Sequence, residues 1–126
     1  LILSKRNHKR AFTNFKQVYD ISMKLAERLG LQLYIHDDSK LPPLKHQQQA
    51  FRNASVVIAP HGGGNVHLLA MSEGSTLVEI MDVMHVEICF LRLAVYKNIN
   101  YYGVNSIRGA VDVKSLIDVC RKISYK

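Results

Sequence analysis

The sequence lacks the features that identify several common classes of protein. No apolar run reaches the roughly 18 residues needed to span a membrane, and no secretory signal peptide is visible. There is no zinc-finger spacing, no helix-turn-helix signature and no glycine-aromatic motif for stacking on RNA bases. We therefore expect no membrane contact from this segment and no nucleic-acid partner.

Acidic residues are scarce relative to basic ones. Ten acidic residues against 17 basic residues give a formal charge of +7, which favours an anionic partner. Much of the excess is local, in a cluster made of Lys5, Arg6, Lys9 and Arg10. A compact cluster of this kind fits a phosphorylated small molecule better than a long nucleic acid.

Cysteine is also scarce, with one residue at position 89 and one at position 120. Both lie in apolar helical patterns, which indicates buried free thiols, with a disulfide between them as the alternative. The 126 residues suffice for a single domain with its own core. Because Leu1 already lies in a strand-like run, we expect a piece of a longer protein.

Short apolar runs alternate with amphipathic segments along the whole chain. Runs rich in β-branched residues predict five strands, at residues 1–4, 31–35, 55–59, 76–80 and 99–102. Helical periodicity predicts helices at residues 14–29, 44–53, 65–72, 86–96 and 112–123. Asn14 with Gln17 resembles a capping box, Gly30 is a natural C-cap, and Asp112 is a natural N-cap. This alternation is typical of an α/β fold with a doubly wound parallel sheet.

The most informative segment joins the strand at 55–59 to the helix at 65–72. Pro60 ends the strand, and His61-Gly62-Gly63-Gly64 follows it. Glycine permits positive φ and lets a ligand approach the main chain closely. The first N–H groups of a helix that begins near Asn65 point into the same space, which suits a phosphate. Open α/β sheets bind ligands at such turns, so we predict a ligand site here.

Three separated blocks of the sequence resemble glycosyltransferase family 61, which includes plant xylan-modifying transferases. The family's His-Gly-Ala-Gly and Val-Glu-Ile motifs are matched with Gly63 in place of the commoner alanine. Residues 65–67 read Asn-Val-His where many members have Leu-Thr-Asn. The three blocks are Arg6, Arg10 and Asn14; His61-Gly62-Gly63-Gly64 with Leu77-Val78-Glu79-Ile80; and Leu93-Ala94 with Tyr101-Tyr102.

This resemblance implies a Rossmann-like domain that forms one half of a GT-B architecture and binds a nucleotide-sugar donor. A missing N-terminal domain would help to bind the acceptor, and the general base would lie outside this chain, so no catalytic residue is named. The implied reaction is an inverting transfer of a sugar to a glycan or glycoprotein hydroxyl. No metal or other cofactor is expected, since Asp-x-Asp is absent and Asp37-Asp38 is adjacent rather than spaced. The implied location is the Golgi or endoplasmic reticulum lumen in a eukaryote and the cytoplasm in a bacterium.

The resemblance also predicts ten donor-binding residues. Arginines would bind phosphate oxygens bidentately, the turn would offer backbone N–H groups, and His61 would donate to a phosphate or sugar hydroxyl. Glu79 would accept from ribose hydroxyls. The ten residues are Arg6, Arg10, Asn14, His61, Gly62, Gly63, Gly64, Asn65, His67 and Glu79.

Each of these assignments has a structural alternative. Asn14 would serve as a helix cap, His61 would hold its own turn, and Glu79 would brace a neighbouring loop. Arg6 and Arg10 would be solvated charges on a loop, and His67 would be a packing or surface residue. His36, His46 and His85 have no partners at metal-ligand spacing, so they are interpreted as surface or loop residues. Phe90, Tyr101 and Tyr102 are interpreted as core residues.

Two other functions stay open from the sequence. The chain is alternatively a non-catalytic nucleotide- or phosphate-binding or regulatory α/β module. A third reading is RNA binding by the basic end, which would show a steep dependence on salt.

Overall fold

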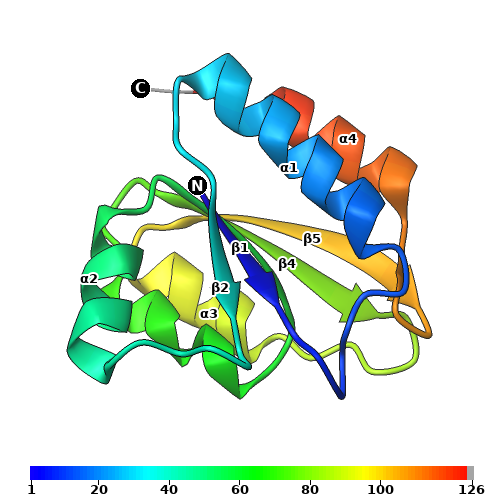
Figure 1. Ribbon diagram of the computed structural model, residues 1–126, viewed down its shortest axis with the longest axis horizontal. Coiled ribbons are helices and arrows are strands. Elements are labelled where there is room, and N and C mark those ends of the chain that lie inside the picture. Colours follow the sequence, from blue (N-terminus) through cyan, green and yellow to red (C-terminus); the bar gives the residue numbers. More distant parts are fainter. Residues whose placement is uncertain (125–126) are drawn as a thin grey trace.

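A computed structural model describes residues 1–124 of the chain, and it leaves the side chains of residues 63–66 outside its description. The described part is a sheet with helices on both faces (Figure 1). The helix η1 is a 3₁₀ helix and the others are α-helices. In chain order the elements are β1 (Ile2–Lys5), α1 (Phe15–Leu29), β2 (Tyr34–Asp37), α2 (Leu44–Asn53), β3 (Val56–Pro60), η1 (Gly63–Ala70), β4 (Thr76–Asp82), α3 (Cys89–Tyr96), β5 (Asn100–Ile107), β6 (Ala110–Val111) and α4 (Val113–Lys122).

The order of the strands places a change of direction at the centre of the sheet. Within residues 1–124 the order is β2-β1-β3-β4-β5-β6, in which β1 to β5 are parallel and β6 pairs antiparallel with β5. The chain passes from β1 outward to β2 and then returns across β1 to β3. The carboxyl ends of β1 and β3 therefore flank the point where the winding reverses, which is where sheets of this type bind ligands.

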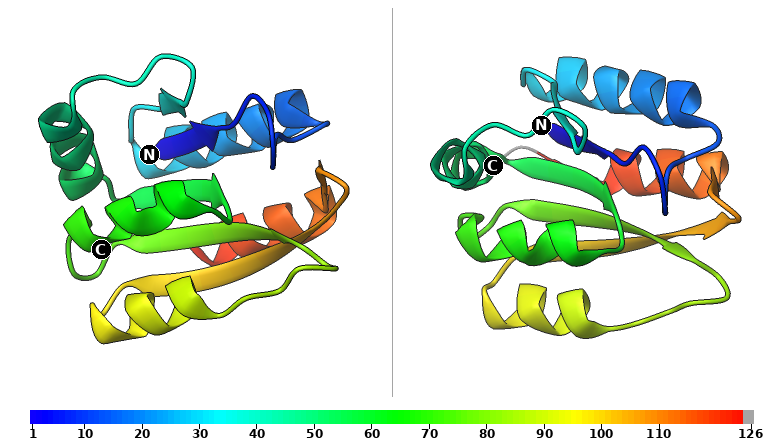
Figure 2. Two further views of the ribbon diagram at one scale, coloured as in Figure 1. Left: turned by 90° about the horizontal axis from the view of Figure 1, so that it is seen from below. Right: turned by 60° about the horizontal axis from the view of Figure 1, so that its bottom comes forward.

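Helices cover both faces of the sheet, which explains why the central strand β3 reads as a continuous apolar run. Figures 1 and 2 show α1 and α4 on one face and α2, η1 and α3 on the other. In β3, Val56 and Ile58 point into the core beneath α1 and α4, while Val57 and Ala59 point into the opposite core. The strand is thus buried along its whole length and forms the centre of the molecule.

The predicted α/β class and the alternation of strands with helices are confirmed. The helix at 44–53, the caps at Gly30 and Asp112 and all five parallel strands are present. The strand predicted at 31–35 begins later, at Tyr34, because Leu31 and Leu33 pack on the core from an irregular segment. The helix predicted at 65–72 is the 3₁₀ helix η1, which begins two residues earlier.

The end of the sheet differs more from the prediction. The strand predicted at 99–102 continues to Ile107 and turns back into β6. Arg108 and Gly109 form this turn with φ of 50° and 85°, as two-residue hairpins of type I′ require. The helix predicted at 86–96 begins only at Cys89.

The two cysteines are both free, and they differ in burial. Cys120 is buried as predicted, and burial raises the pKa of its thiol to about 11. Cys89 is exposed, so its predicted burial is wrong: of the residues of α3, only Ala94 is buried. No helix within residues 1–124 is both long enough and apolar enough to cross a bilayer.

Candidate ligand-binding site at the carboxyl ends of the strands

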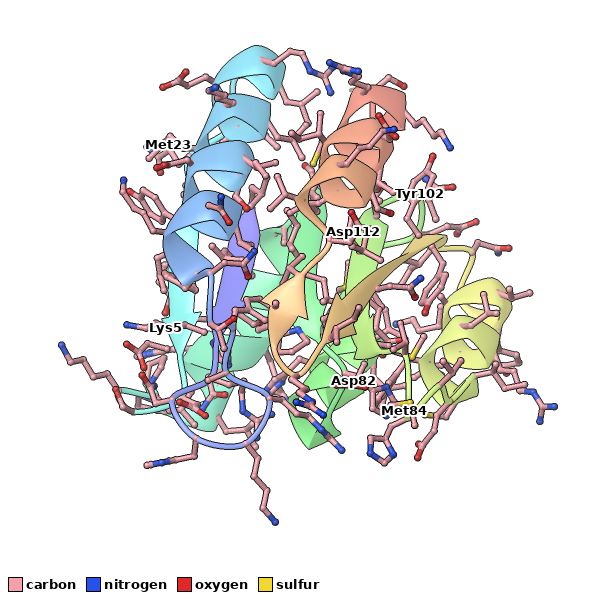
Figure 3. All side chains as sticks on the ribbon, turned by 90° about the vertical axis from the view of Figure 1, so that its right-hand side faces the viewer. Lys5, Met23, Asp82, Met84, Tyr102 and Asp112 are labelled. Atoms are coloured by element: carbon pink, nitrogen blue, oxygen red, sulfur yellow. The ribbon has the colours of Figure 1, made fainter. Side chains whose placement is uncertain are left out.

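A cleft of about 410 Å³ lies over the carboxyl ends of β3, β4 and β5. We call it the carboxyl-end cleft. Figure 3 shows Asp82 and Met84 toward the same end of the molecule as Lys5, the last residue of β1. Residues of both charge signs line the cleft, and its arginines and histidines outnumber its carboxylates. They include His8, Arg10, His61, Asp82, Glu87 and Arg108.

Two guanidinium groups converge on the turn after β3. A Cβ atom built on Gly62 would lie 2.7 Å from Nη1 of Arg10 and 2.9 Å from Nη1 of Arg6. Either distance is shorter than a real Cβ allows, so an alanine at this position would displace both guanidinium groups from where they lie. The predicted grouping of Arg6, Arg10 and Gly62 is thus present in the structure. Of the two reasons expected for glycine in this turn, positive φ does not apply to Gly62, whose φ of 162° is extended. Close approach to the main chain does apply, and it is made by the two arginines.

The two arginines differ in how their charge is balanced. Arg6 donates from Nε to Oδ2 of Asp38 at 2.9 Å. No carboxylate among residues 1–124 lies within ion-pair distance of Arg10. Like charges repel at close range, so an anion between the two guanidinium groups would relieve their repulsion. The pair therefore has the charge and the geometry of a phosphate site.

The backbone of Arg10 is held in an uncommon conformation. Its φ is 67°, in the left-handed region that a non-glycine residue occupies at a cost of about 1–3 kcal/mol. The loop that carries Arg10 packs against the β5–β6 turn: Thr13 N–H donates to the Gly109 carbonyl at 2.9 Å. Gly109 is close enough to this loop that an added Cβ would lie 2.7 Å from the Ala11 carbonyl oxygen. Contacts far along the chain thus fix where Arg10 points.

Asn14 contributes to the same restraint and does not cap α1. Its Oδ1 accepts from the Val111 N–H at 2.9 Å, and its Nδ2 donates to the Val111 carbonyl at 3.0 Å. Nδ2 also donates to Oε1 of Gln17, but no side-chain capping bond forms. The predicted capping box is therefore wrong. Both polar atoms of the Asn14 amide bond to Val111 in β6. Asn14 therefore holds the loop that carries Arg10, rather than contacting a ligand itself.

His61 lies over a buried carboxylate. Its Nδ1 is 2.9 Å from Oε2 of Glu79, whose side chain is 0% exposed. Oε1 of Glu79 accepts a hydrogen bond from the Tyr101 hydroxyl at 2.6 Å. Burial and this carboxylate together raise the pKa of Tyr101 above its usual range, so the hydroxyl stays a donor. Glu79 thus orients His61, as the bracing alternative predicts, and its full burial keeps it from ribose hydroxyls.

The strand pattern explains this position of Glu79. Side chains alternate between faces along β4, so that Val78 and Ile80 enter the core under α1 and α4. Leu77 and Glu79 point to the other face, where Tyr101 and Phe90 also lie. A carboxylate buried there requires donors, and His61 and Tyr101 are two of them.

The carboxylates of the adjacent Asp37 and Asp38 are both engaged by neighbouring side chains. Asp38 pairs with Arg6, and both carboxylates accept from Nδ2 of Asn7. Hydrogen bonds from the hydroxyl and N–H of Ser39 and from Asn7 lower the pKa of Asp37 to about 2. These carboxylates fix the direction of Arg6. A different group of potential metal ligands, made of His61, Glu87 and Cys89, borders the cleft.

A smaller cavity of about 220 Å³, which Arg6 lines, lies between β1, β2 and α2. Pro60 lines both this cavity and the carboxyl-end cleft. His36 lines it with only 8% of its surface exposed, and Nδ1 of this ring has no hydrogen-bond partner among the described residues. The interpretation of His36 as a surface or loop residue is therefore wrong, because the later start of β2 turns its side chain inward.

His67 lies beside this cavity rather than in the cleft. Its ring stacks on Phe51 with centroids 4.9 Å apart and meets the His36 ring edge-on at 5.7 Å. Burial lowers the pKa of His67, and burial followed by the His67 charge lowers the pKa of His36. The packing alternative for His67 fits this geometry.

Gly63, Gly64 and Asn65 open η1 immediately after Gly62. Their side-chain environments, and so the predicted contact of Asn65, lie outside the described residues. The α-helix expected to direct its N–H groups at the ligand is a 3₁₀ helix here.

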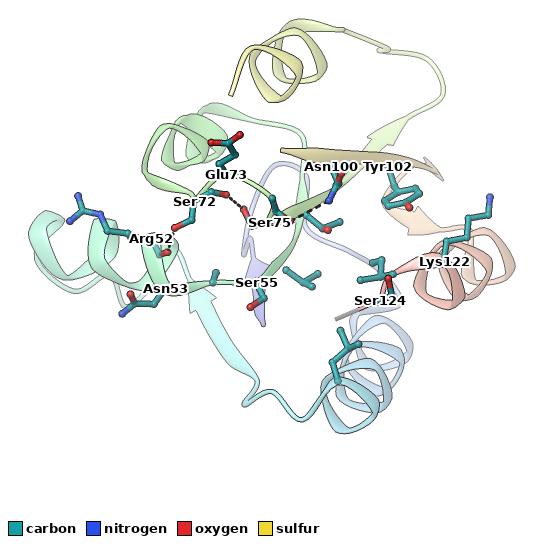
Figure 4. Close-up of a pocket in the computed structure, with 16 residues that line it drawn as sticks. Arg52, Asn53, Ser55, Ser72, Glu73, Ser75, Asn100, Tyr102, Lys122 and Ser124 are labelled. Carbon is teal, nitrogen blue, oxygen red and sulfur yellow. Dashed lines mark hydrogen bonds between the residues drawn. The ribbon is translucent and has the colours of Figure 1, made fainter. Parts of the chain in front are cut away.

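A third depression lies at the opposite end of the strands and is larger, at about 570 Å³. Figure 4 shows this amino-end pocket, with Ser55, Ser75 and Asn100 at the beginnings of β3, β4 and β5. Several of its polar groups bond to one another: Ser72 Oγ donates to the Arg52 carbonyl, and Asn100 donates to the Gly74 carbonyl. Of the predicted site residues whose side chains the structure describes, none lines this pocket.

The sequence analysis missed several residues of the cleft. Arg108 reaches it because the β5–β6 hairpin, which was not predicted, brings it there. His85, interpreted as a surface or loop residue, also lines the cleft, as does His8. Gly109 was the one signal available, since glycine readily adopts the positive φ that a tight type I′ hairpin requires.

Comparisons with known proteins agree on one family. A family model for glycosyltransferase 61 matches residues 1–78. The chain is similar to the β-1,2-xylosyltransferase RCN11 of Oryza sativa subsp. japonica, with 32% identity over 62 residues, 49% of this chain and 12% of that protein. It is also similar to a β-1,2-xylosyltransferase of Arabidopsis thaliana, with 26% identity over 80 residues, 64% of this chain and 15% of that protein. The chain thus spans only a small part of the length of these relatives.

Proposed function

Because this chain belongs to glycosyltransferase family 61, we propose that it forms the donor-binding part of a glycosyltransferase. The reaction is the transfer of a sugar from a nucleotide-sugar to a hydroxyl of a glycan or glycoprotein. The names of the two similar proteins favour a pentosyl donor of the xylose type. The strand order and the helices on both faces suit a Rossmann-like half of a GT-B enzyme.

One observation carries the proposal: Arg6 and Arg10 meet over Gly62 beside the point where the sheet reverses its winding. A nucleoside diphosphate leaves with two negatively charged phosphates, and guanidinium groups bind phosphate oxygens through paired N–H donors. Donors that are already fixed in place stabilise such charge as it develops. Asp38 holds Arg6, and the β5–β6 hairpin holds the loop of Arg10, so both are fixed before the donor binds.

The small cavity lined by Arg6 and the carboxyl-end cleft lined by Arg10 suggest how the donor lies. The diphosphate would sit at the arginines, and the nucleoside would enter the 220 Å³ cavity. There the buried Nδ1 of His36 would gain a hydrogen-bond partner. The sugar would then lie in the carboxyl-end cleft near His61. Pro60, which lines both spaces, marks the route between them.

The proposed transfer inverts the configuration of the sugar and uses no divalent ion on the diphosphate. The positive charge that a metal would supply comes from Arg6 and Arg10, with Arg108 across the cleft. An acceptor hydroxyl needs a general base within hydrogen-bond reach, and we assign that base and the acceptor site to an N-terminal domain.

The experiment measures binding of UDP, GDP, CMP and ADP to the purified chain, with and without Mg²⁺. We expect selective binding of one nucleoside diphosphate at an affinity that Mg²⁺ does not change. Arg10→Ala removes charged hydrogen bonds worth about 1.5–3 kcal/mol, so the affinity falls about 10- to 100-fold. His61→Ala weakens binding of the corresponding nucleotide-sugar more than binding of the nucleoside diphosphate.

Arg52→Ala is the matched control, since Arg52 is an exposed arginine that lines the amino-end pocket. It removes the same charge from the opposite end of the sheet and leaves the affinity unchanged. Equal losses in both variants would mean that net charge, rather than the arginine pair, attracts the nucleotide. Failure of the folded chain to bind any of the four nucleotides would contradict the donor-binding role of the chain alone.

A further inference from the structure

We propose that His61, Glu87 and Cys89 form a binding site for a Zn²⁺ ion. The three residues offer an imidazole nitrogen, a carboxylate oxygen and a thiol sulfur that all lie within 4.8 Å of one another. Zinc accepts this mixture of ligands, whereas Mg²⁺ takes oxygen ligands almost alone. The ion is therefore distinct from one that would serve a diphosphate, and the proposal holds whether or not the chain binds a nucleotide-sugar.

The distances fit tetrahedral coordination with little adjustment. Nε2 of His61 is 3.3 Å from Oε2 of Glu87. A tetrahedral Zn²⁺ with bonds of about 2.0–2.2 Å holds a nitrogen and an oxygen ligand roughly 3.3–3.5 Å apart. These two atoms already have that separation. The sulfur must come within roughly 3.6 Å of each, given a Zn–S bond of about 2.3 Å. Cys89 is exposed, so rotation of its side chain is free to make this change.

The surroundings of His61 have the form that zinc sites use beyond their direct ligands. A metal-bound histidine usually donates its other ring N–H to a carboxylate, which fixes the tautomer and the orientation of the ring. Nδ1 of His61 lies 2.9 Å from the buried Glu79, and Tyr101 holds that carboxylate in turn. This arrangement leaves Nε2, the nitrogen that faces Glu87, as the metal ligand.

The ion would connect two separate segments of the chain. His61 follows β3, whereas Glu87 lies in the segment between β4 and α3 and Cys89 is the first residue of α3. Glu87 and His61 both line the carboxyl-end cleft. Zinc would thus hold the segment from Val83 to Ile88 against the turn after β3 and fix one wall of the cleft. Three protein ligands leave a fourth position for water.

A metal-free arrangement accounts for part of the same geometry. A protonated His61 would form ion pairs with Glu79 and Glu87 at once, at 2.9 and 3.3 Å. That arrangement gives no role to Cys89. The thiol therefore separates the two explanations, and the experiment is built on it.

The test titrates the metal-free, reduced chain with Co²⁺ and follows the thiolate-to-cobalt charge-transfer absorption, which only a cysteine ligand produces. We expect one equivalent of Co²⁺ to produce this band and Zn²⁺ to displace it. Cys89→Ser abolishes the band, and Glu87→Gln weakens Co²⁺ binding at least tenfold. Glu79→Gln weakens it about 10- to 100-fold, as loss of a supporting carboxylate does at other zinc sites.

Cys120→Ser is the matched control, because Cys120 is the buried thiol on the far side of the sheet. It leaves the band and the affinity unchanged. Glu87 and Cys89 are exposed, so their variants fold, and circular dichroism confirms it. Absence of a charge-transfer band in the native chain overturns the proposal. So does a band that persists in Cys89→Ser, or a Co²⁺ affinity that Glu87→Gln leaves unchanged.

Discussion

The two ends of the parallel sheet differ in how their polar groups are used. At the amino ends of the strands, side chains and carbonyls of the larger pocket bond to one another, as Ser72 and Ser75 do. At the carboxyl ends, two guanidinium groups converge on one glycine, and Arg10 has no carboxylate partner within residues 1–124. The site that we propose is therefore at the smaller of these two cavities. We base that choice on charge that the protein leaves unbalanced and holds in place.

The same contrast appears in the backbone. At the carboxyl ends, Arg10 and Arg108 both have positive φ, and long-range hydrogen bonds hold the segments that carry them. Strain of this kind persists only where the surrounding structure enforces it, and it often occurs at ligand sites. The positive φ at Gly74, beside the amino-end pocket, falls on a residue that adopts it freely. Asn98, at the same end, also has a positive φ of 56°, but asparagine occupies this region more readily than arginine does.

The largest expected effect comes from removing the carboxylate under the cleft. Glu79→Ala leaves Nδ1 of His61 and the Tyr101 hydroxyl without their acceptor inside the protein. Loss of one partner from a buried pair of this kind lowers the free energy of unfolding by about 3–5 kcal/mol. Glu73→Ala, at an exposed carboxylate of the amino-end pocket, changes it by less than about 0.5 kcal/mol. Urea unfolding of the two variants checks the difference, and similar losses would remove the distinction between the two ends.

The next effect tests the close approach at Gly62. Gly62→Ala places a Cβ within 3 Å of both guanidinium groups and pushes them apart. We expect the affinity for the nucleoside diphosphate to fall about 10- to 100-fold, which corresponds to roughly 1.4–2.7 kcal/mol of binding free energy. Gly103→Ala is the control, because its Cβ would meet only ordinary contacts at 3.8 Å. Calorimetric titration of both variants measures the effect, and unchanged binding by Gly62→Ala would separate the arginine pair from the ligand.

A smaller effect tests the long-range restraint on the arginine loop. Asn14→Ala removes two hydrogen bonds to Val111, and we expect it to lower the free energy of unfolding by about 1–3 kcal/mol. Nucleotide affinity falls as well, because the loop that carries Arg10 loses its attachment to β6. Asn53→Ala, whose side chain accepts one bond from Gln49 on the surface, serves as the control. Thermal unfolding and nucleotide titration together check this, and loss of stability without loss of affinity would limit Asn14 to a structural role.

The sequence was sufficient to predict those parts of the site that depend on the succession of strands and helices along the chain. Alternating elements predicted the parallel sheet, and the switch in winding brings Arg6 and His61 to one edge, as the motif spacing suggested. The partners of Asn14 and Glu79 were not predictable in the same way. Asn14 bonds to a residue 97 positions away, and Glu79 required knowing which face of β4 lies under α3. A local pattern predicts an element, but it does not identify the donor that a buried carboxylate finds across the sheet.

His36 shows how an error in the position of a strand changes the predicted environment of a residue. Placing the second strand at 31–35 left His36 in a loop, whereas the observed strand runs from Tyr34 to Asp37 and buries it. Leu31 and Leu33 gave an apolar signal because they pack on the core, and packing does not require strand pairing. A shift of three residues therefore changed a surface histidine into a cavity wall.

The smallest expected effect follows from that burial and concerns pH. Burial lowers the pKa values of His36 and His67 below the ordinary value of 6.5. The folded state therefore favours the neutral rings, and its stability is complete above pH 6.5 and declines as the pH falls below that value. His36→Gln reduces this decline, whereas His46→Gln, at an exposed histidine of α2, leaves it unchanged. Unfolding midpoints measured from about pH 7.5 down to about pH 5 distinguish the two. Since protonation of His36 would also add charge to the proposed nucleoside cavity, nucleotide affinity should change over the same range in the native chain. It should not change in this way in His36→Gln, and an identical pH profile in both proteins would remove His36 from the binding site.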